Sequence, residues 1–142
     1  AALRYFNVFG PRQDVNSEYS AVIPIFITRA LEDKDLIIYG SGKQRRDFIY
    51  VSDVANAVLT FAQNNIDGVF NIGTNRDYSL VELADIILKK TNSHSKIVFA
   101  EERLGDVMFS TADLKKQNDT GVWTPRIAFD DGLQKTINYY IK

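Results

Sequence analysis

The sequence predicts an α/β fold in which a small mixed or parallel sheet is flanked by helices. Short runs of β-branched and aromatic residues alternate along the chain with stretches whose apolar residues recur at helical spacing. No repeat, low-complexity tract or linker interrupts this alternation. The 142 residues are therefore expected to form one compact α/β unit, either a whole domain or a piece of a larger protein.

Five short segments have the composition of strands, because they are rich in β-branched and aromatic residues and most end at turn-forming residues. The strand candidates are residues 3–6, 36–39, 48–51, 69–72 and 96–99. A segment of helical length joins the third candidate to the fourth. Such a crossover predicts that strands 48–51 and 69–72 run parallel.

Apolar stripes and capping residues mark the helices. Residues 23–31 carry one apolar helical face, and Pro24 is tolerated in a first turn. Ser52 is expected to cap a helix over 53–63, and Ser79-Leu-Val-Glu82 is a capping box that opens another helix. Two more helices are expected, one over residues 111–118 and one through Leu133, Ile137, Tyr140 and Ile141.

Composition excludes several classes of function. The 17 basic and 18 acidic residues nearly cancel, so the chain lacks the charge that nucleic acids or anionic membranes attract. No cysteine is present, which excludes disulfides, thiolate catalysis and cysteine-based metal sites. The longest apolar run, residues 21–27, is far shorter than the about 20 residues of a membrane span. A cytoplasmic protein with no nucleic-acid, membrane or metal partner is expected.

The segment Tyr39-Gly-Ser-Gly-Lys43 imitates two catalytic motifs and meets the requirements of neither. A phosphate-binding P-loop needs glycine five residues before its Gly-Lys and Ser or Thr after it, but Ile37 and Gln44 stand there. A catalytic Tyr-x-x-x-Lys pair needs one helical turn between its members. With Gly40 and Gly42 inside it, this segment is predicted to be a turn between strands.

Five motifs, in order, resemble the C-terminal half of the NAD-dependent nucleotide-sugar epimerase/dehydratase family, a group of extended short-chain dehydrogenases. They are LRYFNVFGPRQ, VIPIFI, IIYGSGKQRRDFIYVSDVA, VFNIGT, and ERLGD followed by TADLKK. The resemblance covers essentially the whole chain. Within the family, "RYFNVFGPRQ" and "RLGD" look most like UDP-sugar 4-epimerases.

The resemblance implies that residues 1–142 form the substrate-binding part of an extended Rossmann-type epimerase. The family's glycine-rich NAD loop and its helical Tyr-x-x-x-Lys are not found in these residues. The chain is therefore expected to contain no catalytic residue, to be inactive alone, and to leave NAD mainly to a preceding domain. The intact parent is expected to be a homodimer that acts on a UDP-sugar.

The resemblance also assigns individual residues. Arg46 and Arg103 would clamp the diphosphate from two loops, since planar guanidinium groups bind phosphate oxygens in pairs, and Asn7 would donate to it. Asp106 would accept a hydrogen bond from a ribose hydroxyl. The other candidates are Gln44 near the diphosphate, Ala21, Val22, Phe26, Ile37 and Tyr39 around the uracil ring, and Phe6 at the nicotinamide end of NAD.

The same residues also fit ordinary structural roles. Asn7 suits an Asx turn at a strand end, and Arg46 with Asp47 suits a surface ion pair. Arg103 and Asp106 suit a solvated loop. The apolar candidates Ala21, Val22, Ile37 and Tyr39 are equally explicable as core.

Two classes of function stay open. In an epimerase, NAD takes hydride from C4 of the UDP-sugar and returns it to the opposite face after the keto sugar has rotated. This half would hold the UDP meanwhile. A dTDP-glucose 4,6-dehydratase or a UDP-sugar decarboxylase would share the same half. The alternative class is a nucleotide-sugar binding module without catalysis.

Overall fold

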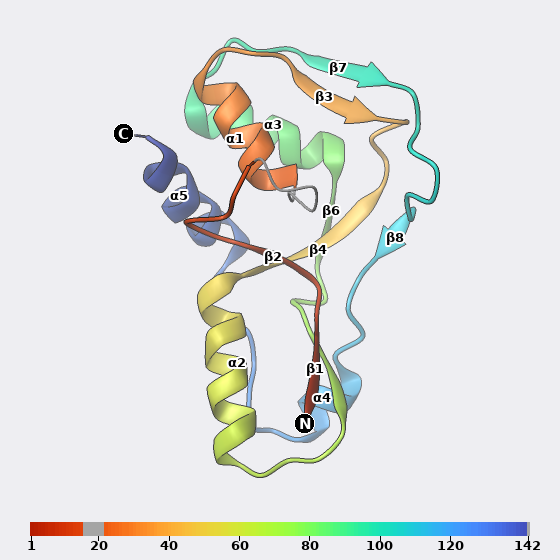
Figure 1. The fold of residues 1–142 in the computed structure, drawn as a ribbon, viewed down its shortest axis with the longest axis vertical. Coiled ribbons are helices and arrows are strands. Elements are labelled where there is room, and N and C mark those ends of the chain that lie inside the picture. Colours follow the sequence, from red (N-terminus) through yellow and green to blue (C-terminus); the bar gives the residue numbers. More distant parts are fainter. Residues whose placement is uncertain (16–21, 142) are drawn as a thin grey trace.

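The computed structural model describes residues 1–15 and 22–141 (Figure 1). Its elements in chain order are β1 (Ala2–Tyr5), β2 (Asn7–Phe9), α1 (Val22–Leu31), β3 (Leu36–Tyr39), β4 (Arg45–Tyr50), α2 (Val51–Gln63), β5 (Val69–Ile72), β6 (Asp77–Ser79), α3 (Leu80–Thr91), β7 (Ile97–Ala100), β8 (Phe109–Ser110), α4 (Lys115–Asp119) and α5 (Phe129–Tyr140). Two lobes are visible, one around α1, α3 and α5 and one around α2, β1 and β5 (Figure 1). Strands β2 and β4 run between them. The predicted α/β class with parallel strands and flanking helices is confirmed.

The N-terminal extended segment consists of two consecutive strands, β1 and β2, which pair with different neighbours. Strand β1 pairs in parallel with β5, and β2, which follows after the single residue Phe6, pairs in parallel with β4. The Phe6 amide also donates to the Ile72 carbonyl at 3.0 Å. The segments 48–51 and 69–72 are not paired with each other. Each is parallel to one of the two consecutive strands β1 and β2, and this is how the predicted parallel arrangement arises. Helix α2 provides the predicted crossover between the two segments.

Strand β4 is the hub of the mixed sheet. Its second half pairs with β2, whereas its first half pairs antiparallel with β6 and parallel with β8. Strands β6 and β8 were not predicted, since two or three residues are too few to show an alternating pattern. Strand β3 pairs in parallel with β7, which begins one residue later than predicted.

Two predicted helix starts are wrong. Helix α2 begins at Val51 directly after β4, with Tyr50 in an extended conformation at its N-cap position and no side-chain cap, so Ser52 is not the cap. Helix α4 covers only Lys115–Asp119 instead of 111–118. The preceding residues are held outside the helix, because the Thr111 hydroxyl donates to Asp77 at 2.5 Å and the Ala112 amide to Asp47 at 3.1 Å.

The capping box of α3 is confirmed. Ser79 Oγ accepts from the Glu82 amide at 3.1 Å, and the Glu82 carboxylate accepts from the Ser79 amide at 2.7 Å. These two bonds satisfy two amides that an uncapped helix would leave without partners. They fix where β6 ends and α3 begins.

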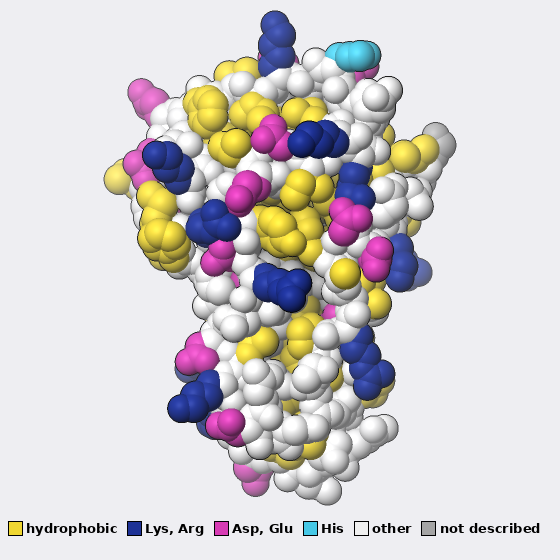
Figure 2. All heavy atoms as spheres, turned by 180° about the vertical axis from the view of Figure 1, so that it is seen from behind, with side chains coloured by type: hydrophobic (Ala, Val, Ile, Leu, Met, Phe, Trp, Pro, Cys, Tyr) yellow, Lys and Arg dark blue, Asp and Glu magenta, His cyan; other side chains and the backbone are white. Residues whose placement is uncertain are grey.

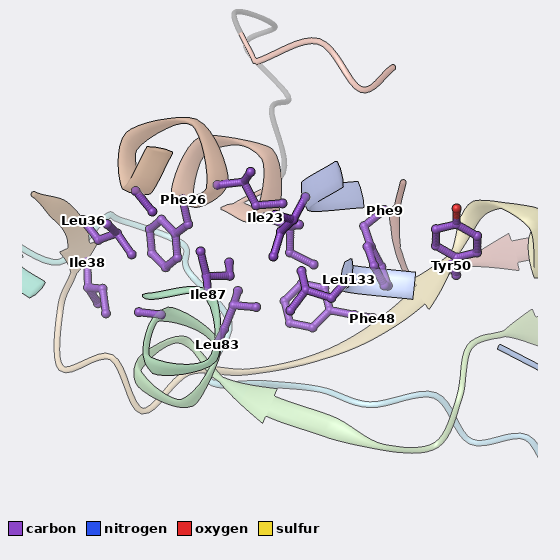
Figure 3. Close-up of a cluster of buried hydrophobic side chains, with 14 residues drawn as sticks. Phe9, Ile23, Phe26, Leu36, Ile38, Phe48, Tyr50, Leu83, Ile87 and Leu133 are labelled. Carbon is purple, nitrogen blue, oxygen red and sulfur yellow. The ribbon is translucent and has the colours of Figure 1, made fainter. Parts of the chain in front are cut away.

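Two apolar clusters lie on opposite sides of β4. The larger packs α1, α3 and α5 against the sheet and includes Phe9, Ile23, Phe26, Leu36, Ile38, Phe48, Leu83, Ile87 and Leu133 (Figure 3). The smaller packs α2 against β5 and includes Ile49, Val54, Phe61, Phe70, Ile72 and Trp123. Successive side chains of a strand point to opposite faces, so Phe48 and Tyr50 join the first cluster and Ile49 the second. The two lobes are thereby joined through one strand.

The surface carries charges of both signs. On the face in Figure 2, Lys and Arg side chains are interspersed with Asp and Glu side chains, and small apolar areas lie between them. Within the described part of the chain, no helix is long and apolar enough to cross a membrane.

Candidate functional site

A pocket of about 370 Å³ lies between α1, β3, β4 and the loop that follows β7. Eight of the ten predicted substrate residues line it, namely Asn7, Val22, Phe26, Ile37, Tyr39, Arg46, Arg103 and Asp106. These residues come from segments nearly one hundred positions apart in the chain, so the fold has brought them together. Ile25, Arg29, Phe48 and Leu80 also line the pocket and were not predicted.

One face of α1 forms the apolar wall. Val22, Ile25, Phe26 and Arg29 line the pocket and are spaced i, i+3, i+4 and i+7, which places them on one side of a helix. Helical spacing from Val22 is therefore the sequence signal that could have identified Ile25 and Arg29. Ala21 lies outside the described residues.

The segment 39–43 is a turn, as predicted. Tyr39 ends β3, and Gly40 and Gly42 have φ angles of 75° and 72°, in the left-handed region that favours glycine. The Gly42 carbonyl accepts from the Val81 amide at 3.2 Å, which docks the turn on the first turn of α3. Lys43 is exposed, consistent with the rejection of both catalytic motifs.

Gln44 lies behind the pocket wall and does not line it. Its side chain is only 1% exposed, and its Nε2 donates to the Tyr39 carbonyl at 2.7 Å and to Asp106 Oδ2 at 3.2 Å. Gln44 therefore holds Asp106 against the turn, a supporting position that the motif alone did not reveal.

Arg46 ties the loop after β7 to strand β4. Its Nη2 donates to Asp106 Oδ1, and its Nη1 donates to the carbonyls of Val107 at 2.5 Å and Arg45 at 2.9 Å. Its partner is thus Asp106, not the adjacent Asp47. A guanidinium has five N–H groups, so these three contacts leave two donors of this pocket-lining residue without an acceptor among the described residues.

Arg103 lies on the ring of Tyr39. Its Cζ is 3.8 Å from the ring centroid, which is the geometry of a cation–π contact. A guanidinium stacked in this way keeps its N–H groups directed outward in its own plane, where an anion can accept them. Two arginines from separate segments therefore stand on the polar side of the pocket.

Asp47 organises the loops behind the pocket. Its carboxylate is fully buried and accepts from the amides of Thr74, Asn75 and Ala112 and from the Thr74 hydroxyl at 2.6–3.1 Å. Its backbone carbonyl accepts from Asn7 Nδ2 at 2.8 Å. This last bond orients the amide of Asn7, which lines the pocket.

A second set of polar contacts surrounds Arg45, the first residue of β4. Arg45 Nε donates to Asp77 Oδ1 at 2.5 Å, and its Nη1 lies 3.1 Å from Glu82 Oε2. Hydrogen bonds from Thr111 and Arg45 hold the pKa of Asp77 below its ordinary value. The backbone and hydroxyl of Ser79, followed by Arg45, lower the pKa of Glu82. These carboxylates join Arg45 of β4 to β6 and to the first turn of α3.

Phe6 lies apart from this pocket. It is half-buried and lines a more open depression with Arg4, Tyr5, Asn7, Asn71 and Ser110. Asn7 lines both depressions and so marks where they meet.

A sequence model of the NAD dependent epimerase/dehydratase family matches residues 1–73, just over half of the chain. The chain belongs to this family.

Two solved structures and one further relative are close in sequence. The UDP-N-acetylglucosamine 4-epimerase of Methanobrevibacter ruminantium, solved with UDP-N-acetylmuramic acid, is 40% identical with a TM-score of 0.93, over 99% of this chain and 45% of its own. The UDP-glucose 4-epimerase of Thermotoga maritima, solved with UDP-glucose, is 37% identical with a TM-score of 0.89, over 97% of this chain and 44% of its own. UDP-glucuronic acid decarboxylase 1 of Xenopus tropicalis is 35% identical over 98% of this chain and 32% of its own. The chain thus spans less than half the length of each.

Proposed function

We propose that this chain is the nucleotide-sugar-binding half of an NAD-dependent UDP-sugar 4-epimerase. The observation that carries the proposal is the pocket itself, which joins an apolar slot between α1 and β3 to a polar end with Arg46 and Arg103. A flat base beside two phosphates requires that combination. The missing NAD-binding residues would then belong to a preceding domain of the complete protein.

The polar end suits a diphosphate. Each guanidinium can donate two N–H groups to phosphate oxygens. The side-chain amide of Asn7 donates one N–H to the Asp47 carbonyl, and its second N–H can donate to the diphosphate. Asp106 is held by Arg46 and Gln44, and each of its oxygens has a further lone pair with which to accept a ribose hydroxyl. Removing Asp106 would therefore also remove the salt bridge of Arg46.

The apolar slot suits a pyrimidine. Val22, Ile25 and Phe26 on α1 line the pocket together with Ile37 and Tyr39 on β3. Most of these side chains are only partly buried, so they are not fully consumed by the core. A base between them would bury their remaining apolar surface.

NAD would meet this chain at Phe6. The aromatic ring, the amide of Asn71 and the hydroxyl of Ser110 line one open depression and fit a flat heterocycle that bears a carboxamide. NAD supplies the acceptor for hydride from the sugar. The residues of this chain contribute by holding the UDP in place while the sugar turns.

The decarboxylase relative supports a rival within the family, because it matches the same residues at nearly the same identity. The chain's own pocket recognises the nucleotide and so does not separate these reactions. The motifs "RYFNVFGPRQ" and "RLGD" favour the epimerase.

The epimerase, decarboxylase and dehydratase activities can be distinguished by their products. The complete protein, given NAD and in turn UDP-glucose, UDP-N-acetylglucosamine and UDP-glucuronic acid, is expected to invert C4 of a UDP-sugar without loss of carbon. Proton NMR of the sugar anomers reads this directly. Carbon dioxide release from UDP-glucuronic acid, or a 6-deoxy-4-keto product, would replace the epimerase assignment, and UDP-sugar binding without turnover would favour the binding module. The 142 residues alone are expected to be inactive.

A further inference from the structure

We propose that Arg29 reads the far edge of the nucleobase and selects uracil or thymine over cytosine. The inference rests on the proposed function, because it takes the diphosphate to lie at the Arg46 and Arg103 end of the pocket. Arg29 is absent from the motifs that identify the family, and it enters the site only through its position on α1.

Arg29 and Arg103 stand at opposite ends of β3. Arg29 Nε donates to the carbonyl of Asp35, directly before the strand begins, whereas Arg103 stacks on Tyr39, where it ends. Four residues of strand separate these anchors, about 13 Å. On the helix side, Arg29 lies two turns beyond Val22, about 10 Å along the axis. A ligand with its phosphates at Arg103 therefore directs its other end toward Arg29.

The guanidinium of Arg29 is oriented and still has donors to give. The bond from Nε to Asp35, at 2.5 Å, uses one of its five N–H groups. Among the described residues, no carboxylate forms a salt bridge with Arg29, although Arg29 is, after Lys34, one of the two cations that lower the pKa of Glu32. No protein acceptor among those residues takes the N–H groups of its two terminal nitrogens. Since Arg29 lines the pocket, these four N–H groups are available to a ligand acceptor.

Base chemistry then decides the preference. When the ribose and phosphates occupy the Arg103 end, the atom farthest from the ribose is the substituent on C4 of the pyrimidine. In uracil and thymine that substituent is a carbonyl oxygen, which accepts hydrogen bonds, whereas in cytosine it is an amino group, which donates. Arginine only donates, so the C4 amino group of cytosine would place a donor against the donors of Arg29 and no hydrogen bond would form there.

A structural role for Arg29 makes a different prediction. A cation in the last turn of α1 also interacts favourably with the helix dipole. That role would make any loss of binding the same for every nucleotide. The ratio of UDP to CDP affinity therefore separates base reading from helix stabilisation.

The test is calorimetric titration of the complete protein with UDP and with CDP. We expect the wild type to bind UDP at least about 10-fold more tightly than CDP, and Arg29→Met to weaken UDP by roughly 10- to 100-fold while changing CDP by less than about threefold. Arg29→Lys, which keeps a cation with three N–H donors on a flexible stem, should restore part of the ratio. Arg103→Met is the control and should weaken both ligands equally.

If the ratio of UDP to CDP affinity in Arg29→Met equals that of the wild type, Arg29 does not read the base and the inference is overturned. If Arg103→Met still weakens the binding of both nucleotides in that case, the proposed nucleotide site is retained. Failure of the wild type to bind UDP would overturn both the inference and the proposed function.

Discussion

Asp47 illustrates how one residue outside the pocket determines its shape. The side chain is fully buried and accepts hydrogen bonds from three backbone amides that lie in two different loops. Because Arg46 is its neighbour on β4, the strand's alternation turns Arg46 toward the pocket and Asp47 away from it. The adjacent Arg and Asp of the sequence thus serve opposite faces, which excludes the surface ion pair that their proximity suggested.

Asp77 provides a pH-dependent test at the residue scale. Its folded pKa is depressed by Thr111 and Arg45, so its contribution to stability is present above the ordinary value of about 3.9 and is lost as pH falls through the folded value. Asp77→Asn should lower the free energy of unfolding at pH 7 and have less effect at pH 3. Urea denaturation at both pH values measures this. An equal loss at the two pH values would contradict the ionic role.

The two serines predicted as helix caps give a matched pair at the element scale. Ser79 caps α3 with both bonds of a capping box, whereas Ser52 lies inside α2 with no capping bond. Ser79→Ala should therefore cost about 1 kcal/mol of unfolding free energy, and Ser52→Ala less than about 0.5 kcal/mol. Urea midpoints compare the two variants. Equal losses would mean that the α2 start has been misassigned.

The glycines offer a second comparison between elements. A Cβ on Gly42 would lie 2.5 Å from Val81 on α3, whereas a Cβ on Gly105 would meet nothing within 4 Å, although both residues have a positive φ. Gly105→Ala should cost about 1–2 kcal/mol from backbone strain alone, and Gly42→Ala about 2–4 kcal/mol because the turn must also move from α3. Thermal or urea unfolding measures both. A Gly42→Ala variant no less stable than Gly105→Ala would contradict the tight docking of the turn.

The elements that could be predicted from the sequence are those that a local sequence pattern specifies. The capping box of α3 and the glycine turn are local, and both are confirmed. The start of α2 depends instead on β4 running directly into a helix, and α4 is shortened by bonds from Thr111 and Ala112 to distant aspartates. Such tertiary bonds override local preference and leave no pattern in the sequence.

At the scale of the whole molecule, the motifs identified the pocket residues but not their partners. Eight predicted residues meet in one pocket because five segments converge there. Which carboxylate would pair with Arg46, and that Gln44 would lie behind the wall, depended on the loop after β7 folding back onto β4. Ile25 and Arg29 could have been predicted as pocket residues from their helical spacing relative to Val22 and Phe26. The family motifs alone did not indicate them.

The most direct test of the nucleotide site is the UDP affinity of the complete protein and two variants, measured by calorimetry. Arg103→Met removes a guanidinium that stacks on Tyr39 without pairing with a carboxylate among the described residues, so little else should change. It should weaken UDP binding by roughly 10- to 150-fold, as expected for a charge-assisted contact to phosphate. Lys43→Ala, in the exposed glycine turn, should change the affinity by less than about twofold. A loss with Lys43→Ala as large as that with Arg103→Met would contradict this account and return the phosphates to the glycine turn.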